Sequence, residues 1–360
     1  MLRKIILNFK KTVLQVSFFS ILSLLFCFCQ SDPPLFTESP YADKAEFESV
    51  WQFIKAFSIY QDSSIYQGRI PENPFIFSRP EEMFDWLADT LKGSLYTHYT
   101  DASEYYKHGL ASAITGSSPL VTFKSLTAKT GLITISTFMG DSIYRQFLGC
   151  VNQIPPTCEN LIIDLRRNTG GSIPEVDSVV GAFLPVGKAY IMARERIREL
   201  RSSPIVTRDW HPWYTHGEHS VLKGKKLIVW MDGFTASASE ILAAALKDCA
   251  SARLVGSRSF GKGIGQVILI RNKRLDLQIT YLQLRGMSNA TGYYHGTGLK
   301  PDVEISGVSE EEKLSSVIRL FEPMYTGSIT INSVSSVHKE VVPAGYKIIY
   351  EDSLCNYQEF

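Results

Sequence analysis

The spacing of apolar residues changes near residue 120 and so divides the chain into two parts. Before that point, apolar side chains recur every three or four positions, as at Phe47, Val50, Trp51, Ile54 and Phe57. This period places them on one face of a helix. A second run of the same kind covers residues 78–91 and has Pro80 in its first turn, where proline is well tolerated. We therefore predict a small helical module over residues 43–119.

After residue 120 the pattern alternates between strand and helix. Residues 132–138 (LITISTF) alternate as a strand does, and the next runs are short and mostly apolar, as in buried strands. The predicted strands are 132–138, 161–165, 227–230, 253–255, 266–270 and 275–284, and the predicted helices are 142–151 and 237–247. Such alternation predicts an α/β core with right-handed crossovers over residues 120–306. The extension at 307–360 carries a predicted helix at 310–321 and has no assignable role.

The first 31 residues have the layout of an export signal. Four basic residues and no acidic ones flank the apolar run 16–29, and polar residues follow it. Cys27 and Cys29 indicate a lipoprotein signal, although each follows a phenylalanine where a small residue is expected. An uncleaved anchor and a cleaved signal stay open beside it. Residues 32–42 read as a tether, so we expect the body to lie on the extracytoplasmic, periplasmic side, attached to the membrane.

Charge and cysteine content narrow the function only slightly. Lys plus Arg is 37 and Asp plus Glu is 36, which gives a net charge of +1 and argues against a nucleic-acid partner. In an oxidising compartment Cys150 either pairs with Cys158 or both stay buried thiols. Histidines cluster over residues 211–219, but their spacing matches no zinc site, so this segment is either a metal site or a solvated loop.

Three turns rich in glycine or serine follow predicted strands, which is where α/β proteins place their sites. The first, residues 164–171 (DLRRNTGG), ends in Gly170-Gly171. It is either a plain tight turn or a source of uncovered N–H groups for an oxyanion. The second, residues 234–240 (FTASASE), puts Ser237 where helix N–H groups favour negative charge. Because Ser237-x-x-Glu240 is also a capping box, Ser237 is either a nucleophile or a cap.

The third turn, residues 256–263 (GSRSFGKG), sets Lys262 between two glycines. It is no phosphate-binding loop, because Gly263 replaces the required hydroxyl and a strand follows instead of a helix. Lys262 is then either a surface lysine or a base. Together the three turns supply a nucleophile, a base and oxyanion donors. A lysine acts as a base only if burial lowers its pKa by several units from about 10.4.

This combination resembles the carboxyl-terminal processing, or tail-specific, proteases of peptidase family S41. The motifs that carry the resemblance are DLRRNTGG, FTASASEILAAALKD, VGSRSFGKGIGQ and GTGLKPDVEI, between residues 132 and 305. The family nucleophile lies 25 positions before the lysine, which selects Ser237 over Ser239. The resemblance implies that Lys262 is the general base and that Gln266 orients it. It also implies oxyanion donors at Ala238 and at Gly170 or Gly171, and a structural role for Asp248.

The resemblance also implies a fold, an activity and a substrate class. The fold is a Clp-protease/crotonase-like ββα superhelix. The activity is that of a serine endopeptidase that cleaves proteins or peptides near their C-terminal tails, with no metal and no organic cofactor. Family members usually carry a PDZ domain before the first core strand. Only about 30 residues separate Asp101 from Leu132 here, which is too few for a PDZ domain. A non-catalytic, peptide-binding or scaffold member is therefore the alternative.

Overall fold

The computed structural model describes residues 98–101, 119–197, 206–216, 220–271, 275–307, 309–327 and 346–350. The export segment, the tether and the two helices predicted before residue 100 lie outside these residues. Within the predicted helical module, residues 98–101 form a strand, β1 (His98–Asp101), which pairs antiparallel with β10 (Leu275–Arg285). Among the described helices, none is long and apolar enough to cross a membrane.

One sheet carries the candidate site. Its strands run in the order β11-β8-β7-β4-β3-β2. Their bounds are β2 Val121–Ser125, β3 Thr130–Ile135, β4 Asn160–Asp164, β7 Lys226–Met231, β8 Arg253–Gly256 and β11 Val303–Glu304. All neighbouring strands are parallel except β2, which is antiparallel to β3. Every residue of β4 is buried, as expected for a strand in a sheet covered on both faces. The α/β core predicted from the alternation is confirmed.

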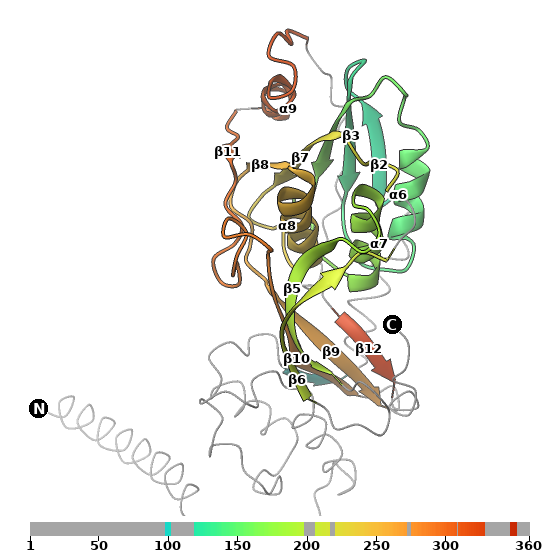
Figure 1. The fold of residues 1–360 in the computed structure, drawn as a ribbon, viewed down its shortest axis with the longest axis vertical. Helices are drawn as coiled ribbons and strands as arrows, with labels where there is room; N and C mark the ends of the chain where they lie inside the picture. The colour runs from blue at the N-terminus through green and yellow to red at the C-terminus, as the bar shows by residue number, and fades with distance from the viewer. Residues whose placement is uncertain are drawn as a thin grey trace, which may run out of the picture.

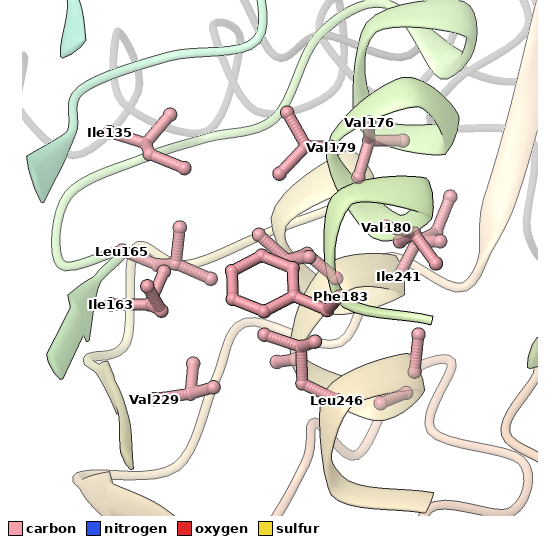
Figure 2. Packing of buried hydrophobic residues seen from close by; sticks show 14 of the residues in the cluster. Ile135, Ile163, Leu165, Val176, Val179, Val180, Phe183, Val229, Ile241 and Leu246 are labelled. Carbon is pink, nitrogen blue, oxygen red and sulfur yellow. The ribbon is translucent and has the colours of Figure 1, made fainter. Parts of the chain in front are cut away.

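Helices cover both faces of this sheet (Figure 1). One face carries α6 (Ile143–Val151), α7 (Ile173–Phe183) and α8 (Ala238–Ala250). Figure 2 shows Phe183 of α7 between Ile163 of β4 and Leu246 of α8, in the largest apolar cluster of the described residues. On the other face, buried side chains of α9 (Glu310–Arg319) pack against Ile162 and Trp230. Helix α7 was not among the predicted elements.

A second sheet extends from the lysine turn. Its strands run in the order β12-β9-β10-β5-β6, and β1 also pairs with β10. Their bounds are β5 Ala189–Ile197, β6 Val206–Tyr214, β9 Ile264–Arg271 and β12 Tyr346–Tyr350. Strands β9 and β10 were predicted, whereas β5 and β6 were not. Because β9 begins two residues after Lys262, this sheet fixes the direction in which the chain leaves the candidate site (Figure 1).

Candidate active site

The three glycine- and serine-rich turns meet at one edge of the first sheet. They follow β4, β7 and β8, which are parallel neighbours, so their carboxyl ends lie together. The Ala236 N–H donates to the Asn168 carbonyl at 3.1 Å, which joins the first turn to the second. The Phe260 N–H donates to the Thr235 carbonyl at 2.9 Å, which joins the second turn to the third. Backbone hydrogen bonds therefore set the relative positions of the three turns.

Ser237 sits at the start of α8 in a backbone conformation that an ordinary cap does not need. Its φ is 57° and its ψ is −119°, while helix caps usually have extended backbone. Positive φ is costly for a residue with a side chain and persists where the surroundings enforce it, most often at functional sites. The Ser237 carbonyl accepts the N–H of Glu240 at 2.9 Å and that of Ile241 at 3.1 Å. Backbone groups therefore close the first turn of the helix.

Glu240 joins the nucleophile turn to the lysine turn, a role that the sequence analysis missed. Its Oε1 accepts from the Ser259 hydroxyl at 2.5 Å and the Gly261 N–H at 2.7 Å. Its Oε2 accepts from the Ser237 N–H at 3.0 Å and the Lys262 N–H at 2.7 Å. Its side chain is fully buried. The sequence signal that could have revealed it is a charged residue next to the apolar run ILAAAL.

The shared oxygen of Glu240 brings Ser237 and Lys262 together. Both backbone nitrogens donate to Oε2, so they are no farther apart than these two hydrogen bonds laid end to end. The predicted nucleophile and the predicted base, 25 positions apart in the sequence, are therefore neighbours in space. The structure thus brings the two predicted residues to the same edge of the sheet.

Lys262 is a buried amine rather than a surface one. Its side chain is 1% exposed, and burial lowers its pKa to about 8, against the opposing effect of the Glu240 charge. The pKa of His295 is lowered too, mainly by burial and to a smaller extent by the nearby charge of Lys262. Gln266, on β9, is also 1% exposed. Its amide group donates to the Thr280 hydroxyl at 3.5 Å, and its Oε1 has no partner among the described residues.

The glycine turn lies directly against the nucleophile turn. A Cβ on Gly170 would lie 2.8 Å from Cβ of Ser237 and 3.0 Å from N of Ala238, at a φ of +104°. The Gly170 N–H donates to Asn168 Oδ1 at 2.9 Å and is therefore occupied. In the described part of the chain no acceptor is recorded for the N–H of Gly171 or of Ala238. Of the two predicted glycines, Gly171 is thus the one with an available donor.

Other residues singled out in the sequence lie outside the site. Asp248 accepts from the backbone N–H groups of Met287 and Ser288 and from two hydroxyls, so it anchors a turn at the far end of α8. His211 contacts Glu195 at 3.0 Å, and no cluster of metal ligands occurs in the described residues. Cys150 and Cys158 are both buried and free, each with its thiol directed at a backbone carbonyl.

Comparisons with known proteins match the part of the chain that carries the three turns. The sequence model of peptidase family S41 matches residues 129–305. A probable CtpA-like serine protease from Staphylococcus epidermidis is 28% identical over 178 residues, which cover 49% of this chain and 33% of that protein. The corresponding Staphylococcus aureus protein is 27% identical over 177 residues, with the same two shares. The chain thus matches about a third of the length of these curated relatives.

A solved structure extends the likeness to the fold. The structure of a lipoprotein from Streptococcus agalactiae has a TM-score of 0.55 and is 13% identical; the match covers 81% of this chain and 99% of that one. At this identity the likeness concerns the fold alone. The family match begins at the strand where the motif resemblance begins and ends at the same residue, Ile305. Through residues 129–305, the chain therefore belongs to peptidase family S41.

Proposed function

We propose that this protein is an exported serine endopeptidase that works with a Ser237–Lys262 dyad. The observation that carries the proposal is the shared Glu240 oxygen, which holds the backbone of the two residues together while the lysine side chain is buried. A buried amine loses its charge more readily than an exposed one, and only the neutral amine accepts a proton. The chain thus has a serine and a buried lysine, whose neutral form accepts a proton, at one sheet edge.

In the proposed reaction, Ser237 Oγ attacks the carbonyl carbon of the scissile peptide bond while Lys262 Nζ takes the hydroxyl proton. The negative charge that develops on the carbonyl oxygen meets the N–H groups of Ala238 and Gly171, at the start of α8 and in the glycine turn. The Lys262 ammonium then protonates the leaving amine, and the acyl-enzyme forms. Lys262 next activates a water molecule that hydrolyses this ester and frees Ser237. Gln266 orients the lysine throughout.

The substrate and location follow from the family likeness and the N-terminal sequence. The proposed substrates are proteins or peptides cleaved near their C-terminal tails. Residues 1–31 deliver the body across the membrane and residues 32–42 tether it there, either by lipid on Cys27 or Cys29 or by an uncleaved anchor. Replacing both cysteines by serine separates these forms, because release or blocked processing indicates lipid and unchanged membrane attachment indicates an anchor. Protection of the body from added protease in spheroplasts would contradict export.

A peptide-binding protein without activity is the second candidate, and the short stretch between Asp101 and Leu132 favours it. Incubation of the full chain in detergent with an unstructured protein distinguishes the two. Mass spectrometry of the products should show cleavage near the substrate's C-terminus that persists in EDTA and stops in Ser237→Ala. Substrate that binds and stays intact would support the peptide-binding candidate. Activity lost in EDTA and restored by zinc would point instead to His211 and its neighbours.

A further inference from the structure

The Glu240 carboxylate makes more contacts than a capping box requires. A capping box uses one of its hydrogen bonds, the one from the Ser237 N–H. The other three come from Ser259, Gly261 and Lys262, all in the lysine turn. These three bonds close no helix end. They fix the turn that presents Lys262 against the turn that presents Ser237.

The surroundings of Glu240 suit an anion. All four hydrogen bonds are donated to its oxygens, and an ionised carboxylate is an acceptor only. Burial raises the pKa of this carboxyl, and the four donors act in the opposite direction. Charges interact strongly in a buried site because the local dielectric is low. The charge state of Lys262 therefore affects the protonation of Glu240, and the charge state of Glu240 affects the protonation of Lys262.

Two further titratable groups face this pair, both from the segment after residue 292. The Tyr294 side chain is buried, and burial together with the Glu240 charge raises its pKa. His295 lies near Lys262, and burial lowers its pKa. The segment is held to the lysine turn by the Gly296 N–H, which donates to the Gly261 carbonyl at 2.8 Å. Neither ring carries a negative charge near neutral pH. Among the described residues, Glu240 is the anion whose charge acts on the Lys262 amine.

We propose that Glu240 is a positioning residue that holds the lysine turn on the nucleophile turn and stabilises Lys262 once it is protonated. The inference rests on the proposed function. When Ser237 attacks, its O–H bond breaks, an N–H bond forms on Lys262, and the amine becomes an ammonium, on which the Glu240 charge acts. The carboxylate interacts more strongly with the ammonium than with the neutral amine. It therefore favours the transition state over the ground state.

The test compares Glu240→Gln with Glu175→Gln. Glu175 occupies the same position in α7, three residues after the cap, and accepts from the Tyr144 N–H at 2.6 Å, away from the dyad. In Glu240→Gln we expect the acidic limb of kcat/KM to move to lower pH by about one unit. We also expect the plateau kcat to fall at least about tenfold. In Glu175→Gln both should stay as in the wild type.

A second readout does not depend on activity. The full chain carrying 13C at the lysine Cε is titrated by NMR, and the Lys262 signal is assigned by its loss in Lys262→Met. Its midpoint should fall in Glu240→Gln and stay in Glu175→Gln. In Glu240→Asp, which withdraws the charge by one methylene, the midpoint should fall by less. This variant carries the test if Glu240→Gln does not fold.

An unmoved or raised Lys262 midpoint in the Glu240 variants would overturn the inference, even if their activity were lost. Such a result would leave Glu240 a purely structural residue. A wild-type chain without peptidase activity would instead overturn the proposed function. The NMR titration would still decide whether the two groups are coupled, so the two failures are distinguishable.

Discussion

Helices α7 and α8 pack against each other and begin with the same Ser-x-x-Glu pattern, but the two starts differ. Ser172, before α7, has φ −65° and ψ 126°, the extended backbone of a cap, and its side chain accepts the Glu175 N–H at 3.4 Å. Ser237, before α8, has φ 57° and ψ −119°. The residue types and spacing are equal. Backbone conformation is what separates an ordinary cap from a candidate nucleophile.

The two glutamates differ in what they hold. Glu175 binds the backbone of Tyr144 and so ties α7 to the start of α6. Glu240 binds the lysine turn through three hydrogen bonds and the nucleophile turn through one. Among the described residues, a buried lysine, Lys262, lies in the turn that packs on the start of α8, and the start of α7 has no such lysine. A Ser-x-x-Glu pattern therefore acquires chemical meaning from the turn that packs on it.

Replacing each of the two serines by alanine is the strongest test of the difference between the two helix starts. Ser237→Ala should lower kcat/KM by at least about 10³-fold, because the nucleophile is lost, with little change in the melting temperature. Ser172→Ala should keep activity within about twofold and cost about 1 kcal/mol of stability, because only a cap is lost. Peptidase assays and thermal unfolding on both variants measure this. Near-normal turnover by Ser237→Ala would show that the two helix starts do not differ in function.

Two glycines test whether close contact with the nucleophile turn matters for activity. Gly170 and Gly140 have nearly the same φ, +104° and +102°, but a Cβ on Gly170 would lie 2.7 Å from the Ala236 carbonyl oxygen, while Gly140 has open space around it. Gly170→Ala should displace the nucleophile turn and lower kcat/KM about 10²-fold. Gly140→Ala carries the same backbone strain and should stay fully active. Equal losses in both variants would mean that strain, and not contact with Ser237, matters at Gly170.

The pH dependence tests the base that α8 has and α7 lacks. Lys262 accepts a proton only when neutral, so kcat/KM should rise with pH and level off above its pKa of about 8. Below that pH the rate should fall about tenfold per unit, the slope of a single titrating group. Steady-state kinetics between pH 5 and pH 10 give the profile. An acidic limb near pH 6.5 would instead indicate histidine and contradict the lysine assignment.

Much of the core and most of the candidate site were predictable from the sequence. Strand and helix periods located β3, β4, β7, β8 and α8, because strands buried in a parallel sheet and helices between layers leave strong local patterns. The three turns were found because glycine and serine mark sharp turns at strand ends. The family motifs then selected Ser237 over Ser239 and paired it with Lys262.

The rest depended on contacts between distant residues. The partners of Glu240 lie around 20 positions away along the chain, so a capping box was all that spacing alone indicated. The occupied N–H of Gly170 depends on the orientation of Asn168, which spacing does not report. Strands β5 and β6 are long and only partly buried, so their polar residues hid the alternation. Helix α7 was missed although Ser172-Ile-Pro-Glu is a capping signal with proline in the first turn.

The most direct test is to trap the acyl-enzyme and locate it. The full chain is mixed with an activated peptide ester, quenched in acid within the first turnover and mapped by mass spectrometry after digestion. The acyl group should be found on Ser237, should be absent in Lys262→Ala, and should remain in Ser172→Ala. An acyl group on Ser172 or Ser239, or one that forms equally well in Lys262→Ala, would contradict the dyad.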